Sequence, residues 1–137
     1  MKILLLFAFL IVFDSKSLSQ DYSDISFNVY RNDSKIGHHK VSFDIIESEL
    51  NVFIDINFIV KFLGITIYRY EHLNQEKWFN NNLVSINSRT NKNGTKLYCE
   101  LANIKNPTVP SSYWNYVLVS DKNITELKNT QDCSSIK

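Results

Sequence analysis

The strongest constraint on the fold of this chain is a regular alternation of apolar and mostly polar residues over residues 50–62. A helix would spread these apolar side chains around its circumference, whereas a strand places all of them on one face. The segment therefore predicts a long β-strand with one buried face. Its apolar positions are Leu50, Val52, Ile54, Ile56, Phe58, Val60 and Phe62.

Shorter alternating segments lie on both sides of this strand, and turn-forming residues separate them. Asn, Asp, Gly and Ser at these junctions favour tight turns, and Asn93–Gly94 is a strong hairpin signal. Residues 102–115 contain both prolines and predict a loop. We expect strands over residues 25–31, 35–46, 50–62, 65–79, 83–90 and 95–101, with weaker strands over 116–119 and 123–127.

The composition agrees with a chain built from strands. It contains 15 Ile, 9 Phe and 7 Tyr, but only 2 Ala and 3 Gly, and β-branched and aromatic residues favour strands. No helical pattern separates the expected strands, which excludes parallel βαβ folds. We predict an all-β fold: an antiparallel meander that forms a curved sheet or an incomplete barrel, like a lipocalin or a lipoprotein carrier in outline.

The N-terminus has the layout of a secretory signal peptide. Lys2 precedes an apolar run over residues 3–13, and small residues at Ser17 and Ser19 resemble a cleavage site. The run is too short to span a bilayer as a helix. We expect a signal helix over 1–19, a single β-rich domain over 20–137, and export to the periplasm or beyond, in a Gram-negative bacterium. The alternative is an uncleaved anchor or a buried first element.

Cleavage would leave the exported chain close to electrical neutrality. The whole sequence has 15 basic and 14 acidic residues, and residues 1–19 contain Lys2, Lys16 and Asp14. A balanced charge argues against electrostatic steering toward nucleic acid or an anionic membrane. We therefore expect no nucleic-acid partner and no stable membrane insertion after cleavage.

Several motifs occur together in a recognisable order. As a set they resemble a family of secreted bacterial proteins of unknown function, whose members carry a Y-W-N motif after a proline loop. The resemblance implies an exported, β-rich protein and no particular chemistry. The motifs are FNVYRNDSKIGHHKVSF (27–43), FLGITIYRYEHLNQEKW (62–78), TNKNGTK (90–96), PSSYWN (110–115) and NTQD (129–132).

This chain departs from the family pattern in two ways. Ser34, Asn82 and Cys133 stand at turn positions where the family usually has Gly. Family members also usually continue for several strands beyond the last motif. We therefore expect either a C-terminally truncated chain or a shortened member with an exposed sheet edge, and the genomic DNA downstream of Lys137 would distinguish the two.

The strand over 65–79 carries the most distinctive set of side chains. Its even positions place aromatic and polar groups on one face, together with the apolar face of 50–62. Such a wall suits a ligand with an apolar or flat body and a few hydrogen-bonding groups. The alternative is a packed core in which the polar groups satisfy one another. The candidate ligand-binding residues here are Tyr68, Tyr70, His72, Glu76 and Trp78.

His39 lies on the same face of its strand as Val41 and Phe43, and it also matches a histidine of the family. We include it among the ligand-binding candidates. His39, His72 and Glu76 would suit zinc binding or acid–base chemistry if they met. Their spacing has no metal-motif character, however, so we predict no metal, no cofactor and no catalytic residue.

The proline loop and the cysteines add further candidates. Tyr113, Trp114 and Asn115 would either plug one end of the sheet or form a lid over a ligand. Ser111 and Ser112 lack the glycine elbow that an exposed nucleophilic serine usually needs. Cys99 and Cys133 would form a disulfide in an oxidising compartment.

The biochemical function does not follow from these patterns. The leading hypothesis is an exported β-protein that binds an apolar or amphiphilic small molecule on its curved sheet. The first alternative is a hydrolase-type enzyme that uses His39, His72 and Glu76. The second is an envelope-assembly protein whose open sheet edge docks a partner strand.

Overall fold

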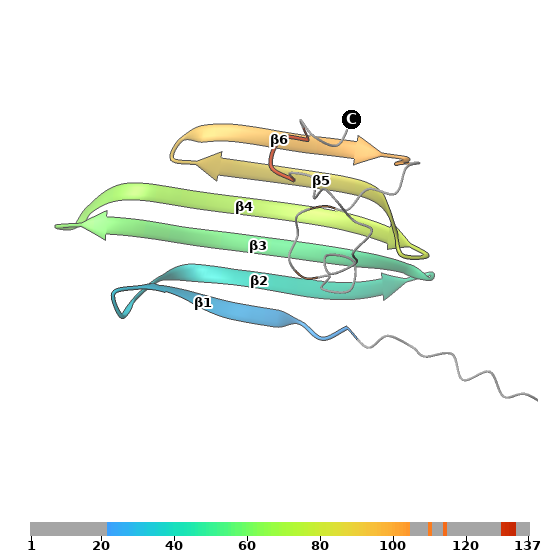
Figure 1. Cartoon of the computed structure of the whole chain (residues 1–137), viewed down its shortest axis with the longest axis horizontal. Helices are drawn as coiled ribbons and strands as arrows, with labels where there is room; N and C mark the ends of the chain where they lie inside the picture. The colour runs from blue at the N-terminus through green and yellow to red at the C-terminus, as the bar shows by residue number, and fades with distance from the viewer. Residues whose placement is uncertain (1–21, 105–109, 111–113, 115–129, 134–137) are drawn as a thin grey trace, which may run out of the picture.

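The computed structural model describes residues 22–104, 110, 114 and 130–133. Figure 1 shows its six antiparallel strands side by side, in chain order, as one open curved sheet. The all-β meander predicted from the sequence is therefore confirmed. Residues 1–19 and the weak strands expected over 116–127 lie outside the described residues. The strands are β1 (Ile25–Arg31), β2 (Ser34–Ile46), β3 (Glu49–Phe62), β4 (Ile65–Phe79), β5 (Asn82–Lys92) and β6 (Thr95–Ala102).

Two-residue turns connect the strands, and their residues have positive φ angles, as the twist of a tight hairpin requires. Asn and Gly occupy most of these positions because they tolerate that conformation. Cys133, where we expected the family to have glycine, also has a positive φ of 55°. Ser34 and Asn82 do not, since each begins a strand directly after its turn.

The hairpin register places the alternating residues of neighbouring strands on shared faces. In the β3–β4 pair, Ile54 lies opposite Asn74, and Phe58 lies opposite Tyr70. The even positions of both strands therefore share one face, as predicted. We call it the covered face, because residues from the C-terminal part of the chain pack on it, and we call the other the open face.

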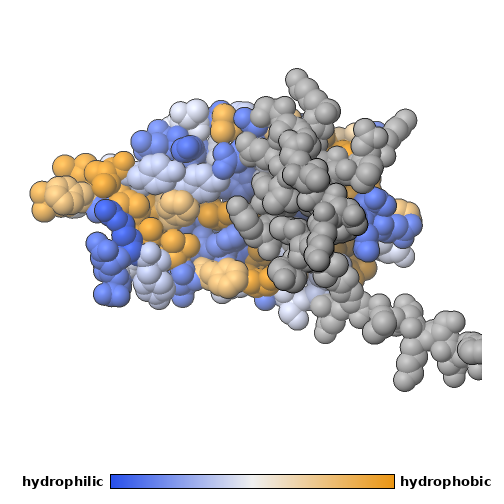
Figure 2. Space-filling model, viewed as in Figure 1, coloured by the Kyte–Doolittle hydropathy of each residue, from blue (hydrophilic) through white to orange (hydrophobic). Residues whose placement is uncertain are grey.

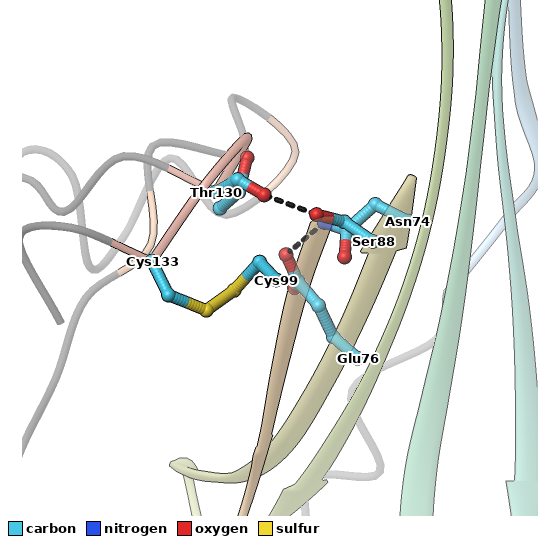
Figure 3. Close-up of a disulfide and its surroundings, with 6 residues drawn as sticks. All are labelled: Asn74, Glu76, Ser88, Cys99, Thr130 and Cys133. Atoms are coloured by element: carbon cyan, nitrogen blue, oxygen red, sulfur yellow. Dashed lines mark hydrogen bonds between the residues drawn. A yellow bond between two sulfur atoms is a disulfide. The ribbon is translucent and has the colours of Figure 1, made fainter. Parts of the chain in front are cut away.

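The core lies on the covered face. Val52, Leu83 and Ile86 are almost completely buried, and the disulfide between Cys99 of β6 and Cys133 closes over them. The Ser88 hydroxyl of β5 donates a hydrogen bond to the Thr130 carbonyl (Figure 3). These contacts fasten residues 130–133 to β5 and β6.

The core occupies only one end of the sheet. We call the end with the β2–β3 and β4–β5 turns the core end, since Trp78 and Leu83 lie there, and the opposite end the tip end. Toward the tip end the covered face is only partly buried. This half of the face is therefore the accessible part.

Gly37 shows how closely the strands approach near the tip end. A Cβ atom there would lie 1.9 Å from the Asn57 carbonyl oxygen and 2.6 Å from the Phe58 Cα. Only glycine fits this position without a shift of the backbone. Among the residues that the structure describes, we find no helix with the length and apolar character of a membrane span.

Candidate functional site

Glu76 lies toward the core end of the covered face and is 0% exposed. Its Oε1 accepts a hydrogen bond from Asn74 Nδ2 at 2.8 Å (Figure 3). Its Oε2 accepts from the indole Nε1 atoms of Trp78 and Trp114, each at 3.0 Å. Both carboxylate oxygens are thus used as acceptors, and Glu76 links β4 to the proline-loop residue Trp114.

The two tryptophans also pack against each other. The Trp78 and Trp114 rings meet edge to face with centroids 5.4 Å apart, and Phe43 packs on Trp114 at 5.5 Å. Such contacts between rings favour the plug interpretation of Trp114 over the lid. A hollow of about 240 Å³ beside Tyr22, Trp78 and Trp114 remains at this end. Tyr113 and Asn115 lie outside the described residues.

Toward the tip end, four aromatic rings form a continuous row on the covered face. Phe58 of β3 stacks between Tyr70, with centroids 5.1 Å apart, and Tyr68, with centroids 6.0 Å apart. Tyr70 also stacks with His72 at 6.3 Å. The three carbocyclic rings are half-buried, whereas His72 is buried. We call Tyr68, Phe58 and Tyr70 the ring row.

The ring row carries polar groups along its edge. The Tyr70 hydroxyl accepts a hydrogen bond from Gln131 Nε2 at 2.9 Å, and burial raises the pKa of Tyr70. This hydroxyl therefore stays protonated at neutral pH. The row thus offers apolar ring faces beside a neutral hydroxyl, as expected of a site for a molecule with an apolar body.

His72 lies beside the ring row on its core side and hydrogen-bonds to its neighbour on β5. Its Nδ1 lies 2.8 Å from the Thr90 hydroxyl. Burial, with a smaller effect from His39, lowers the pKa of His72 to about 4. Burial and His38 also lower the pKa of His39. His72 is therefore neutral at physiological pH.

The structure does not bring His39, His72 and Glu76 together as one set. His39 and His72 share the covered face, but Ile56 of β3 lies between them in the register, which separates their backbones by roughly 10 Å. Glu76 is four residues from His72 along β4, and its carboxylate accepts hydrogen bonds from Asn74 and the two indoles. Among the described residues, no group of three His, Cys, Asp or Glu is placed to hold a metal ion.

The open face carries polar features that the sequence analysis did not single out. His38 Nε2 lies 3.0 Å from Asp55 Oδ2, and the Asn91 amide donates to Glu71 at 2.9 Å. A hollow of about 370 Å³ lies beside these groups and is bordered by Arg89 and Tyr98. The signal that would have found it is the series of odd positions in 65–79, which combines charged groups with the exposed Leu73.

Comparison with known proteins gives one match. The family model described as "Domain of unknown function (DUF6134)" matches residues 27–135. This confirms the resemblance to a family without an assigned function. No curated protein and no solved structure matches the chain.

Proposed function

Because this chain belongs to the family described as Domain of unknown function (DUF6134), whose description names no activity, we propose its function from the sheet itself. The protein is a non-catalytic binding protein that holds an apolar or amphiphilic small molecule against the ring row of the covered face. Within this proposal it acts in the periplasm or outside the cell, where residues 1–19 would direct it.

The observation that carries the proposal is the stacking of Tyr68, Phe58 and Tyr70 in a row that is only half-buried. Aromatic side chains normally bury most of their area in a core. Here the core ends before the row begins, since the tightly packed residues lie toward Trp78. The ring faces therefore stand at the border between packed interior and solvent, where an apolar ligand gains most from contact.

The chemistry of the row limits the class of ligand. Ring faces favour an acyl chain or a fused apolar ring, and the Tyr70 hydroxyl offers a hydrogen bond to a polar group at its end. The neighbouring His72 is neutral at physiological pH. A neutral or weakly polar amphiphile fits this environment better than a highly charged ligand, because burying a charge among ring faces costs free energy.

Binding of the apolar fluorophore N-phenyl-1-naphthylamine tests this proposal. Phe58→Thr removes the central ring of the row but keeps a residue that favours strands. We expect this variant to weaken fluorophore binding about tenfold, which corresponds to about 1.4 kcal/mol. Dodecanoate should displace the fluorophore from the unaltered protein.

Phe53→Thr is the matched control. It makes the same substitution on the same strand, but Phe53 points to the open face and is 43% exposed. We expect its affinity for the fluorophore to stay within about twofold of the unaltered protein. Equal losses in Phe58→Thr and Phe53→Thr, or no binding by the unaltered protein, would exclude the ring row as the site.

A further inference from the structure

The tip of the β3–β4 hairpin is a cluster of exposed apolar side chains. Phe62 is 63% exposed, Leu63 85%, Ile65 69% and Ile67 50%. Phe62 and Ile65 face each other across the turn in the strand register. We call these four residues the apolar tip. Exposed apolar residues on a soluble chain are usually scattered, and a cluster of this kind marks a contact surface.

The apolar tip projects beyond its neighbours. Figure 1 shows that the β3–β4 turn extends further from the sheet than the β1–β2 and β5–β6 turns at the same end. Figure 2 shows apolar side chains gathered at this extremity, with hydrophilic residues beside and below them. A narrow convex projection fits poorly on a flat protein surface, but it inserts readily into a deformable medium.

Cationic side chains flank the apolar tip. They come from the ends of the strands that meet at the tip end, and all of them are exposed. Among the residues of the β1–β2, β3–β4 and β5–β6 turns at this end, the one anionic residue is Asp33. We call the cationic residues the basic collar; they are Arg31, Lys35, Lys61, Lys92 and Lys96.

The core end has the opposite charge. Glu47 lies in the β2–β3 turn, with Asp44 and Glu49 beside it. The near-zero net charge expected for the exported chain therefore hides a separation of charge along the sheet. Exposed apolar residues also occur at the core end, among them Ile45 and Ile46, but they lie beside acidic groups.

From these observations we propose that the apolar tip and the basic collar dock the protein onto the surface of an anionic phospholipid bilayer. The tip side chains enter the boundary between headgroups and acyl chains, and the lysines of the collar contact lipid phosphates. Each cation near an anionic membrane surface contributes attraction that salt weakens. This is contact with one leaflet, not insertion across the bilayer.

The collar also argues against the other occupants of this surface. A symmetric contact between two copies through the tip would bring Lys61, Lys92 and Lys96 of each copy together, and like charges repel at close range. An anionic surface neutralises the same groups. The docking surface does not depend on the ring row, since Phe58 and Tyr70 contribute to neither the tip nor the collar.

Sedimentation with lipid vesicles tests the proposal. The protein is purified after export, its N-terminus is determined by mass spectrometry, and it is mixed with vesicles of phosphatidylcholine alone or of phosphatidylcholine with phosphatidylglycerol. We expect binding to the anionic vesicles to be about tenfold or more tighter than to the neutral ones, and to fall when salt is raised from about 0.1 M to about 1 M.

Two sets of variants separate the roles of the tip and the collar. Leu63→Asn with Ile65→Thr removes apolar area. Asparagine tolerates the positive φ at position 63, and threonine favours the strand at position 65. We expect about a tenfold loss of vesicle binding, with an unchanged circular dichroism spectrum. Ile46→Thr at the core end is the control and should stay within about twofold.

Lys92→Gln with Lys96→Gln tests the collar with two exposed residues whose replacement leaves the core intact. We expect weaker binding to anionic vesicles and a smaller salt effect, whereas Lys77→Gln at the core end changes neither. The proposal would be overturned if the unaltered protein did not bind, or if the tip and collar variants bound as tightly as the unaltered protein. Self-association that the tip variant abolishes, without vesicle binding, would instead assign the tip to a second copy.

The ligand test and the vesicle test fail independently. Phe58→Thr should bind vesicles like the unaltered protein, because Phe58 lies inside the sheet at the register of Tyr70. Leu63→Asn with Ile65→Thr should retain fluorophore binding at the ring row. A protein that binds the fluorophore but no vesicles keeps the proposed ligand site and contradicts only the docking surface.

Discussion

Glu76 connects parts of the chain that lie far apart in the sequence. Its carboxylate accepts hydrogen bonds from Asn74 and Trp78 of β4 and from Trp114, which is 38 residues away. A buried carboxylate is stabilising only when donors surround it. Here the donors are in place, so the group fixes Trp114 on the covered face.

Replacing Glu76 should therefore destabilise the fold to a degree that depends on the replacement. Glu76→Leu leaves the two indole N–H groups and the Asn74 amide without this acceptor, and we expect the free energy of unfolding to fall by about 3–5 kcal/mol. Glu76→Gln keeps one oxygen that can accept from the indoles. Among the described residues, Asn74 Oδ1 has no hydrogen-bond partner. Rotation of the Asn74 side-chain amide by half a turn would therefore let this oxygen accept from the amide nitrogen of Gln at position 76.

We expect Glu76→Gln to cost only about 1–2 kcal/mol, since most of its hydrogen bonds survive. Urea unfolding followed by tryptophan fluorescence measures both variants. Gln75→Leu is the control on the same strand, because Gln75 is exposed on the open face, and it should change stability little. Equal costs for the leucine and glutamine variants would show that Glu76 acts through shape alone.

His72 gives the protein a pH-dependent stability. Its pKa is about 4 in the folded state, against about 6.5 for an unperturbed histidine. Between these values only the unfolded chain binds the proton, so stability is complete above about pH 6.5 and falls as the pH drops toward 4. The expected loss from this group is about 3 kcal/mol.

His72→Asn removes this titration. The asparagine keeps a polar atom near the Thr90 hydroxyl, which in the unaltered protein hydrogen-bonds to His72 Nδ1. Unfolding free energies of both proteins at several pH values between 7 and about 4 give the comparison. The variant should lose less stability on acidification, because the other titrating groups are common to both. Parallel pH profiles would show that His72 does not titrate as its burial implies.

At the scale of strands and turns, alternation and turn chemistry were sufficient to predict the meander. Residues 25–31, 65–79 and the other predicted segments match β1 to β6 within one or two residues at each end. The register did not follow from the turn alone. The Leu63–Gly64 turn pairs Phe62 with Ile65, and an irregularity between Val60 and Lys61 then places Phe58 opposite Tyr70. The shared even face of 50–62 and 65–79 was predicted from the pattern of side chains, but the irregularity that produces it was not.

The division of the covered face into a core end and an accessible end was not predictable in this way. It depends on contacts between residues distant in the sequence, such as Ser88 with Thr130 and Tyr70 with Gln131. Alternation reports which side chains share a face, but it does not report what packs on that face. The aromatic wall expected from the sequence thus contains packed residues, Glu76 and Trp78, and the accessible Tyr68 and Tyr70.

The Cys99–Cys133 disulfide fastens the C-terminal residues to β6, and the two cysteines are 34 positions apart in the sequence. Closing a loop of that length should contribute about 3–4 kcal/mol to stability. We therefore expect a reducing agent to lower the urea midpoint of the unaltered protein. A Cys99→Ser with Cys133→Ser variant should be less stable and insensitive to the reducing agent, and an unchanged midpoint on reduction would contradict this role.

At the scale of the whole molecule, the sheet combines two arrangements. The core end holds the buried Glu76, the paired tryptophans and the disulfide, which fix one half of the covered face. The tip end leaves the ring row accessible and extends into the apolar tip and basic collar. One end thus supplies stability, and the other supplies the proposed contact surfaces.

The proposed function requires that the ring row bind an apolar or amphiphilic molecule. Native mass spectrometry of the protein purified from its source tests this most directly, alongside the same protein after organic extraction and refolding. We expect an added mass of a small amphiphile on the unaltered protein. The added mass should be lost on extraction, absent from Phe58→Thr and present on Phe53→Thr. An unmodified mass throughout, together with no uptake of dodecanoate by the extracted protein, would contradict it.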